Sequence, residues 1–329
     1  MSYGMMVAVQ LDKKEVFDRI WRFSKTYLQH QTGPRKGYFA WSFNPKTMKQ
    51  NSSGSASDGE LYYITSLLFA ANKWGNDTGI NYYKESRKIL DNMWEKDGTD
   101  NIYHLINLKH KQISFVPEGK SYNWTDPSYH LPAFYEIWAT YAKDGHDDFY
   151  RVCADTSRVF LHRATHPVTG LNSDYTEFSG EPHATPWMPP GFRYDSWRVP
   201  MNIAMDYVWY GKDKSWQEGY AKRFQYFLRS KGLDTYDDQF NLDGSKPEFI
   251  LQAGTIKKLR HSIGLVSTAA TTSLMNKDIG SLDFIHAIWN AKLEPYEDGY
   301  FDPYYDGLLY LFSLMHLSGN YQIITPSLK

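Results

Sequence analysis

Residues 56–74 read ASDGELYYITSLLFAANKW and hold the feature that decides the fold. A polar, glycine-containing approach delivers two carboxylates, Asp58 and Glu60, to the start of an apolar segment of helical length. Acidic side chains are stabilised there by the free N–H groups and the dipole of a helix. Taken alone, the pair reads as an N-cap followed by a second helix-start acid. Asp126 and Asp195 lead two further helix starts beside aromatic residues, and three such junctions indicate one shared face.

The helical period dominates the remaining sequence. Helices are expected near residues 59–74, 82–95, 127–143, 147–163, 199–210, 214–230, 262–274, 282–291 and 304–317. Asp12 and Glu15 have the spacing of a capping box before another helix, and residues 102–116 could form a small β-hairpin. The long connections cover residues 29–57, 96–125, 164–195 and 232–261. Loops of that length are more often functional than idle.

With a helix opened by Gly4 or earlier, the sequence contains about eleven helices in hairpin order, which makes it an all-α protein. A closed toroid of six hairpins needs one helix more. Because the first helix begins at Met1 without a cap or lead-in, the chain is expected to lack its N-terminal part. An apolar seam around Met5, Met6 and Val9 would then be left open. No linker or close repeat divides the sequence, so a single domain over 1–329 is expected.

Charge and composition exclude several partners. The net charge of -1 argues against nucleic acid or an acidic membrane surface, and no apolar run reaches the ~18–20 residues of a membrane helix. A single cysteine, Cys153, excludes an internal disulfide. Any signal peptide would precede Met1, so the compartment stays open between the cytoplasm and the periplasm or exterior. A monomer is expected.

Asp195 ends a long aromatic loop at the start of a helix. Pro200 is acceptable only in the first turn of that helix, which fixes Asp195 at the junction. Arg198, three residues further on, can reach back and keep the carboxylate ionised. An ionised, oriented carboxylate is what a general base needs to activate water. The alternative is a cap with a local salt bridge.

The 26 Tyr, 18 Phe and 11 Trp supply flat platforms with a polar edge, which suit sugars. Candidate platforms are Trp41, Trp124, Tyr304 and Tyr305. Asp126-Pro127 is a strong helix start. It would place Tyr129 on the same rim of the protein as Asp58.

His162 and His166 have helical spacing but no third ligand, so no metal is expected. No phosphate loop, dinucleotide fingerprint or nucleophile elbow occurs, which leaves cofactor-free chemistry by carboxylates.

The stretch from Ala56 to Trp74 resembles the signature of family 8 glycoside hydrolases, with Glu60 where that pattern usually has Asp. Other segments that resemble the family are residues 2–6, 126–132, 195–199 and 317–320. The likeness covers essentially the whole chain and is greatest to the reducing-end xylose-releasing exo-oligoxylanases.

The resemblance implies an (α/α)6 barrel, a six-hairpin toroid, that hydrolyses β-1,4-xylosidic bonds of xylooligosaccharides or xylan with inversion. Asp195 matches the general base, and Asp58 matches the acid that holds the distorted sugar. Arg198 and Tyr129 match residues that orient the base and line the centre. Trp41 and Trp124 fall where the family has sugar-stacking aromatics.

Two departures from the family pattern matter. The family's general acid, a Glu shortly before Ser-Tyr-Gly, would lie two residues before Met1, so a chain that begins at Met1 is expected to be hydrolytically inert or nearly so. The Leu-His-Pro turn that blocks the cleft in exo-acting members is matched here by Arg260-His261-Ser262. His261 could still bind the anomeric hydroxyl, and a mixed product pattern is expected.

Three alternatives stay open. The first is an endo-acting xylanase or β-glucanase of the same family, because nothing in the sequence decides between xylose and glucose. The second is a catalytically impaired carbohydrate-binding protein. The third is another α/α toroid enzyme, such as an epimerase or unsaturated-uronide hydrolase, which would be expected to have different His or acid patterns.

Overall fold

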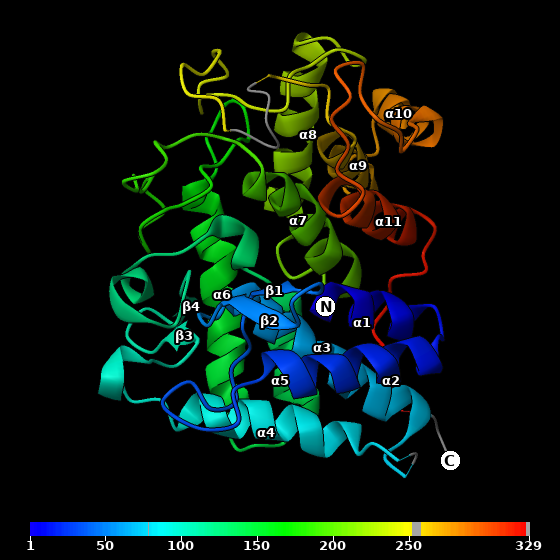
Figure 1. Ribbon diagram of the computed structural model, residues 1–329. Helices are drawn as coiled ribbons and strands as arrows, with labels where there is room; N and C mark the ends of the chain where they lie inside the picture. The colour runs from blue at the N-terminus through cyan, green and yellow to red at the C-terminus, as the bar shows by residue number, and fades with distance from the viewer. Residues whose placement is uncertain (78, 252–257, 327–329) are drawn as a thin grey trace. The chain divides into compact units, whose positions relative to one another are not determined.

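The computed structural model describes residues 1–77, 79–251 and 258–326 (Figure 1). Within these ranges there are eleven α-helices, several short 3-10 or π turns and two small sheets, so the predicted all-α class is confirmed. Most predicted helix bounds lie within two residues of the observed ones. Two compact units are present. The first comprises Met1–Thr125, Pro132–Ser157 and Gln322–Lys329, and the second Asp126–Leu131 and Arg158–Tyr321.

The first unit is built around one buried helix. Its elements are α1 (Ser2–Gln10), α2 (Lys14–Phe23), η1 (Ser24–Leu28), α3 (Ser57–Trp74), α4 (Tyr82–Trp94), η2 (Thr99–Asn101), η3 (Gly119–Asn123), α5 (Pro132–Tyr141) and the start of α6 (Asp147–Ala164). Helix α3 packs against α1, α4 and α5. Residues 60–70 of α3 are all buried, as expected for a helix that is apolar on every side.

Two β-hairpins lie in the long connections of this unit. Strands β1 (Ser42–Asn44) and β2 (Lys49–Ser52) pair antiparallel. The hairpin expected within 102–116 is confirmed as β3 (Ile106–Asn107) with β4 (Gln112–Ile113).

The open apolar seam predicted on the first helix is wrong. Met5, Met6 and Val9 are fully buried, because α2 and α3 pack against α1. The predicted capping box is also wrong. Asp12 has a left-handed φ of 58°, and α2 begins at Lys14 without a side-chain cap. The Asp12 carboxylate instead accepts a hydrogen bond from the Trp74 indole at 2.8 Å.

The second unit packs around α9 (Ile263–Thr271), whose residues are all buried. Helix α9 contacts α7 (Arg198–Trp209), α10 (Leu282–Asn290) and α11 (Tyr305–Leu317), and α9 and α11 run side by side (Figure 1). The remaining elements are the end of α6, α8 (Lys214–Ser230), η4 (Pro127–Tyr129), η5 (Asp195–Trp197), η6 (Thr272–Leu274) and η7 (Ile279–Ser281).

The single helix predicted over 127–143 is interrupted. The short turn η4 ends at Tyr129, His130 is extended, and α5 begins only at Pro132. Proline disfavours a helical conformation in the residue before it, which explains the break. The interruption frees η4 to pack against α7, where the Asn202 amide donates to the Ser128 carbonyl at 2.7 Å.

Candidate active site

Asp195 stands where the sequence predicts it, at the junction between a long loop and a helix. It is the first residue of η5, which continues directly into α7. Pro200 is the third residue of α7, where a missing N–H costs no helical hydrogen bond. The junction is therefore set by local sequence.

The Asp195 carboxylate contacts the Arg198 guanidinium, with 3.0 Å between Oδ1 and Nη2. Arg198 is 5% exposed at its side chain, whereas Asp195 is 28% exposed. A buried guanidinium stabilises the anionic form of the carboxylate beside it. The pair thus presents an oriented carboxylate with access to solvent.

A second carboxyl group lies near the same guanidinium nitrogen of Arg198. Asp126 is fully buried and caps η4 by accepting a hydrogen bond from the Ser128 amide at 2.7 Å. Its Oδ2 is 3.8 Å from Arg198 Nη2. Burial, followed by the charge of Asp195, raises the pKa of Asp126 well above its usual value, although Arg198 opposes the shift. The Tyr129 ring lies under the guanidinium at 5.3 Å, within cation–π range.

Asp174 is a third carboxyl group that the sequence analysis missed. Its Oδ1 accepts hydrogen bonds from the Ser196 amide at 3.1 Å and the Ser196 hydroxyl at 2.8 Å. Burial, and then the charge of Asp195, raises the pKa of Asp174 to about 7. Tyr175 belongs to the same cluster, since burial and the charges of Asp195, Asp126 and Asp174 raise its pKa. The sequence signal that could have identified this group is an acidic residue next to a tyrosine, Asp174-Tyr175, within the long loop 164–195.

The three carboxyl groups differ in the protonation state that their surroundings favour. Burial favours the protonated forms of Asp126 and Asp174, because a charge taken out of water is costly unless it is paired. Asp195 is the most exposed of the three and makes the closest contact with Arg198. This arrangement suits one ionised base supported by two neutral hydrogen-bonding acids.

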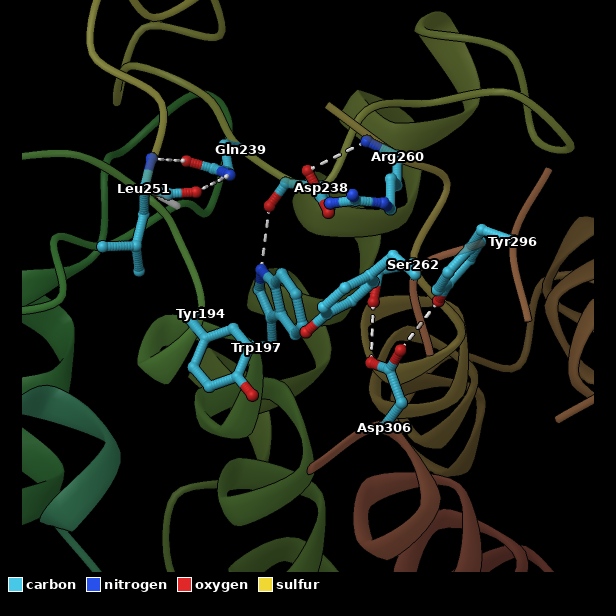
Figure 2. Close-up of a pocket in the computed structure, with 10 residues that line it drawn as sticks. Tyr194, Trp197, Asp238, Gln239, Leu251, Arg260, Ser262, Tyr296 and Asp306 are labelled. Carbon is cyan, nitrogen blue, oxygen red and sulfur yellow. Dashed lines mark hydrogen bonds between the residues drawn. The ribbon is translucent and has the colours of Figure 1, made fainter. Parts of the chain in front are cut away.

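A small cavity adjoins this junction on the side of α9 and α11 (Figure 2). Its volume is about 20 Å³, room for about one water molecule. The Trp197 indole, two residues after Asp195, donates to the Asp238 carbonyl at 2.8 Å. On the opposite wall Asp306 accepts from the Ser262 hydroxyl at 2.9 Å and the Tyr296 hydroxyl at 2.7 Å.

Two residues predicted to contact the reducing-end sugar, Arg260 and His261, are found here. Arg260 lines the cavity, and His261 follows it in the chain. Arg260 is 8% exposed, pairs with Asp298 at 2.9 Å and lies 4.2 Å from the centre of the Tyr300 ring. His261 Nδ1 is 2.9 Å from the Tyr236 carbonyl oxygen. A carbonyl only accepts hydrogen bonds, so Nδ1 carries the proton and Nε2 of the neutral ring is an acceptor.

Tyr304 and Tyr305 differ in their surroundings. Tyr305 is 8% exposed, stacks on Tyr194 at 3.9 Å and donates to the Tyr194 carbonyl at 2.8 Å. Its contacts give it a structural role in holding the loop before Asp195. Tyr304 is 68% exposed.

The other predicted site residues belong to the first unit. Asp58 lies in the first turn of α3, after Ala56 at the N-cap position, so it is not the cap itself. The amino group of Met1 is near enough for Asp58 to raise its pKa, while burial lowers it more strongly. Trp41 is 66% exposed, and Trp124 is 6% exposed and stacks on Phe115 at 4.2 Å.

Glu60, the second acid of the quoted stretch, is a structural group. Its Oε1 accepts from the Phe39 amide at 2.9 Å and the Ser55 hydroxyl at 2.5 Å. Burial raises the pKa of Glu60 to about 8. These bonds fasten the loop that precedes α3 onto the first turn of the helix.

No group of three or more His, Cys, Asp or Glu side chains in 1–77, 79–251 and 258–326 is arranged to hold a metal ion. None of the helices in those ranges is both long enough and apolar enough to cross a membrane.

Comparison with known proteins gives consistent matches. The model of the glycosyl hydrolases family 8 matches residues 1–313. The reducing-end xylose-releasing exo-oligoxylanase Rex8A of Paenibacillus barcinonensis is 36% identical over 98% of this chain and 81% of its own length. A structure of a mutant of that protein, complexed with an arabinofuranosyl-xylotetraose, has a TM-score of 0.89 and 34% identity, covering 100% of this chain and 82% of the other.

A xylobiose complex from Teredinibacter turnerae has a TM-score of 0.88 and 37% identity, covering 99% of this chain and 82% of its own. Family 8 structures are (α/α)6 barrels, so the predicted fold class is confirmed.

Replacing Asp174 by Asn should flatten the dependence of stability on pH. Burial raises the pKa of Asp174 to about 7 in the folded protein, whereas the pKa of the same group in the unfolded chain has its ordinary value of 3.8. The folded state therefore binds more protons in this window, and its stability falls as pH rises. An asparagine oxygen can still accept from Ser196 but does not titrate. At pH 7 the difference should be at most on the order of 4 kcal/mol.

Urea unfolding at several pH values between 4 and 7 would measure this difference. Asp283→Asn, which changes an exposed carboxylate in the same unit, serves as the control and should follow the wild type. Parallel profiles for Asp174→Asn and the wild type would show that Asp174 is ionised in the folded protein.

Proposed function

Because the chain belongs to glycosyl hydrolase family 8, we propose that it hydrolyses β-1,4-linked xylooligosaccharides with inversion and releases xylose from the reducing end. The observation that carries the proposal is the Asp195–Arg198 pair, which is accompanied by the buried carboxyl groups of Asp126, near Arg198, and Asp174, bound to Ser196. The names of the relatives support xylose chains as the substrate class.

In this proposal Asp195 is the general base. An inverting glycosidase activates a water molecule that attacks the anomeric carbon, while an acid protonates the leaving oxygen from the opposite face. None of the residues assigned here supplies that acid, which the family pattern places two residues before Met1, so the reaction is proposed for a form of the protein that includes it. Arg198 holds the Asp195 carboxylate in its ionised form until the water proton is transferred. Tyr129 lies against Arg198 and limits its movement.

Asp58 is assigned to the sugar at the cleavage point. Its place in the first turn of α3 keeps the carboxylate near the free N–H groups of the helix, which stabilise an anion. A carboxylate there can accept hydrogen bonds from ring hydroxyls and favour a distorted sugar. Trp41 and Trp124 are assigned to stacking on neighbouring sugars.

His261 is assigned to the reducing-end hydroxyl. Its Nδ1 is engaged by the Tyr236 carbonyl, so Nε2 is left as the acceptor for a sugar hydroxyl. Ser262 is not assigned to the substrate, because its hydroxyl caps α9 by accepting a hydrogen bond from the Gly264 amide. Arg260 and Tyr304 complete the set assigned to this side.

A second candidate, internal cleavage, is favoured by the segment Arg260-His261-Ser262. It stands in place of the Leu-His-Pro turn of the exo-acting family members. We therefore propose xylose release with some internal cleavage. We also propose that both units form one catalytic domain, since the family match runs through both, and that the protein is a monomer.

Asp195→Asn should lower the rate of xylohexaose hydrolysis by about 10²–10⁴-fold, because an amide cannot take up the proton of water. Binding of xylohexaose, measured by calorimetry, should be nearly unchanged. Asp283→Asn is the matched control, since it alters an exposed carboxylate of the same unit. Wild-type turnover in Asp195→Asn would remove Asp195 from the role of base.

Xylohexaose should be hydrolysed much faster than cellohexaose. The chain-wide similarity to an exo-oligoxylanase motivates this expectation. Initial rates of reducing-sugar release at matched concentrations would measure the preference, and equal rates would favour the endo-acting glucanase alternative.

His261→Ala should change the product pattern more than the rate of cleavage. With reducing-end-labelled xylohexaose, the wild type should yield mainly labelled xylose, and the variant a larger share of labelled xylobiose and xylotriose. The cause is loss of the Nε2 acceptor for the terminal hydroxyl. His286→Ala changes an exposed histidine on α10 and should keep the wild-type pattern. If both variants give the same products, His261 does not select the reducing end.

A further inference from the structure

A second concave site lies on α8, away from the Asp195 cluster. It has a volume of about 420 Å³, within the range of sites that bind small molecules and short chains. One face of α8 forms one side, and the segment around η7 forms the other. We call it the α8 groove, and its main lining residues are Val168, Lys222, Arg223, Gln225, Tyr226 and Arg229. None of them takes part in the proposed reaction.

The floor of the groove is held by a buried amide. Gln225 is 4% exposed and donates to the hydroxyls of Thr272, Ser273 and Ser281 at 2.9–3.1 Å. Its oxygen accepts from the Asn276 amide at 2.7 Å. All hydrogen-bonding groups of this side chain are engaged, so α8 and the η7 segment are fixed to each other and the groove is formed in advance.

The side wall carries an aromatic ring with no structural task in the described contacts. Tyr226 is 77% exposed. Residues 222, 226 and 229 are spaced by three, four and seven positions, and residue 223 precedes 226 by three, which places all four on one face of α8. An exposed ring on a rigid helix offers a flat apolar face and a hydroxyl, the combination that stacks on a sugar.

The charges of the groove leave one cation without a carboxylate. Arg229 pairs with Asp283 at 2.9 Å, and Lys222 with Asp278 at 3.5 Å. Arg223 has no ion pair among the described residues, and its buried Nε has no hydrogen-bond partner. A guanidinium in this state is suited to a carboxylate, which can accept two parallel N–H bonds from it.

These features together match one class of ligand. We propose that the α8 groove is a second carbohydrate site that binds a xylan-derived chain bearing a uronic acid substituent. Tyr226 would stack on a sugar of the chain, and Arg223 would bind the carboxylate of the substituent. The assignment of a xylan chain as the ligand rests on the proposed function. The assignment of a uronic acid substituent rests only on Arg223.

Affinity electrophoresis of the whole protein tests the proposal. Glucuronoxylan in the gel should retard the wild type more than neutral arabinoxylan does. Arg223→Gln should weaken retention by glucuronoxylan about tenfold, the loss expected for one charge-assisted contact, with little effect on arabinoxylan. Tyr226→Ala should weaken retention by both. Salt at about 0.5 M should reduce only the acidic preference.

Two matched variants serve as controls. Trp289→Ala removes an equally exposed aromatic ring from α10, outside the groove, and Arg19→Gln removes an exposed arginine from α2. Both should be retained like the wild type, and all four variants should keep the turnover of xylohexaose.

The outcomes separate this proposal from the proposed function. Equal retention of wild type and Arg223→Gln by glucuronoxylan would overturn the groove assignment, as would equal retention of the wild type by both polymers. If the wild type does not hydrolyse xylohexaose but its retention depends on Arg223 and Tyr226, the proposed reaction fails and the groove stands.

Discussion

The contact of the Arg198 guanidinium with Asp195 and Asp126 is the interaction on which the candidate site depends. Burying carboxylates is costly unless each is paired or neutralised. Arg198 makes its closest contact with Asp195 and a longer one with Asp126. Burial then favours protons on Asp126 and Asp174, and the negative charge is concentrated on the carboxylate that solvent can reach.

One helix organises this arrangement. Arg198 is the first residue of α7, and one turn later Asn202 holds the carbonyl of Ser128. Through these two side chains α7 fixes both the Asp195 carboxylate and the short turn η4, whose cap is Asp126. At its far end α7 is tied to α6 by the buried pair of Asp206 with Arg158 at 2.7 Å. The side chains of the site are therefore held in place by the packed helices.

Sequence patterns identified the parts of the site that depend on local spacing. Asp195 and Arg198 are three residues apart, and Asp126 precedes a proline, so helix-start chemistry located all three. Asp174 was missed because it reaches Ser196 through a long loop without periodicity. The seam around Met5 was wrong for a related reason. The period of a helix identifies its apolar face, but not the later segment of chain that covers it.

The walls of the small cavity beside Asp195 have a consequence for motion. Arg260 joins the segment before α9 to the segment before α11 through its ion pair with Asp298 and its stacking on Tyr300. Ser262 and Tyr296 are joined again through Asp306. Two loops that share so many contacts cannot open independently. If the reducing-end sugar binds here, as proposed, its departure past these loops would require a concerted displacement, with a barrier set by the Arg260 and Asp306 contacts together.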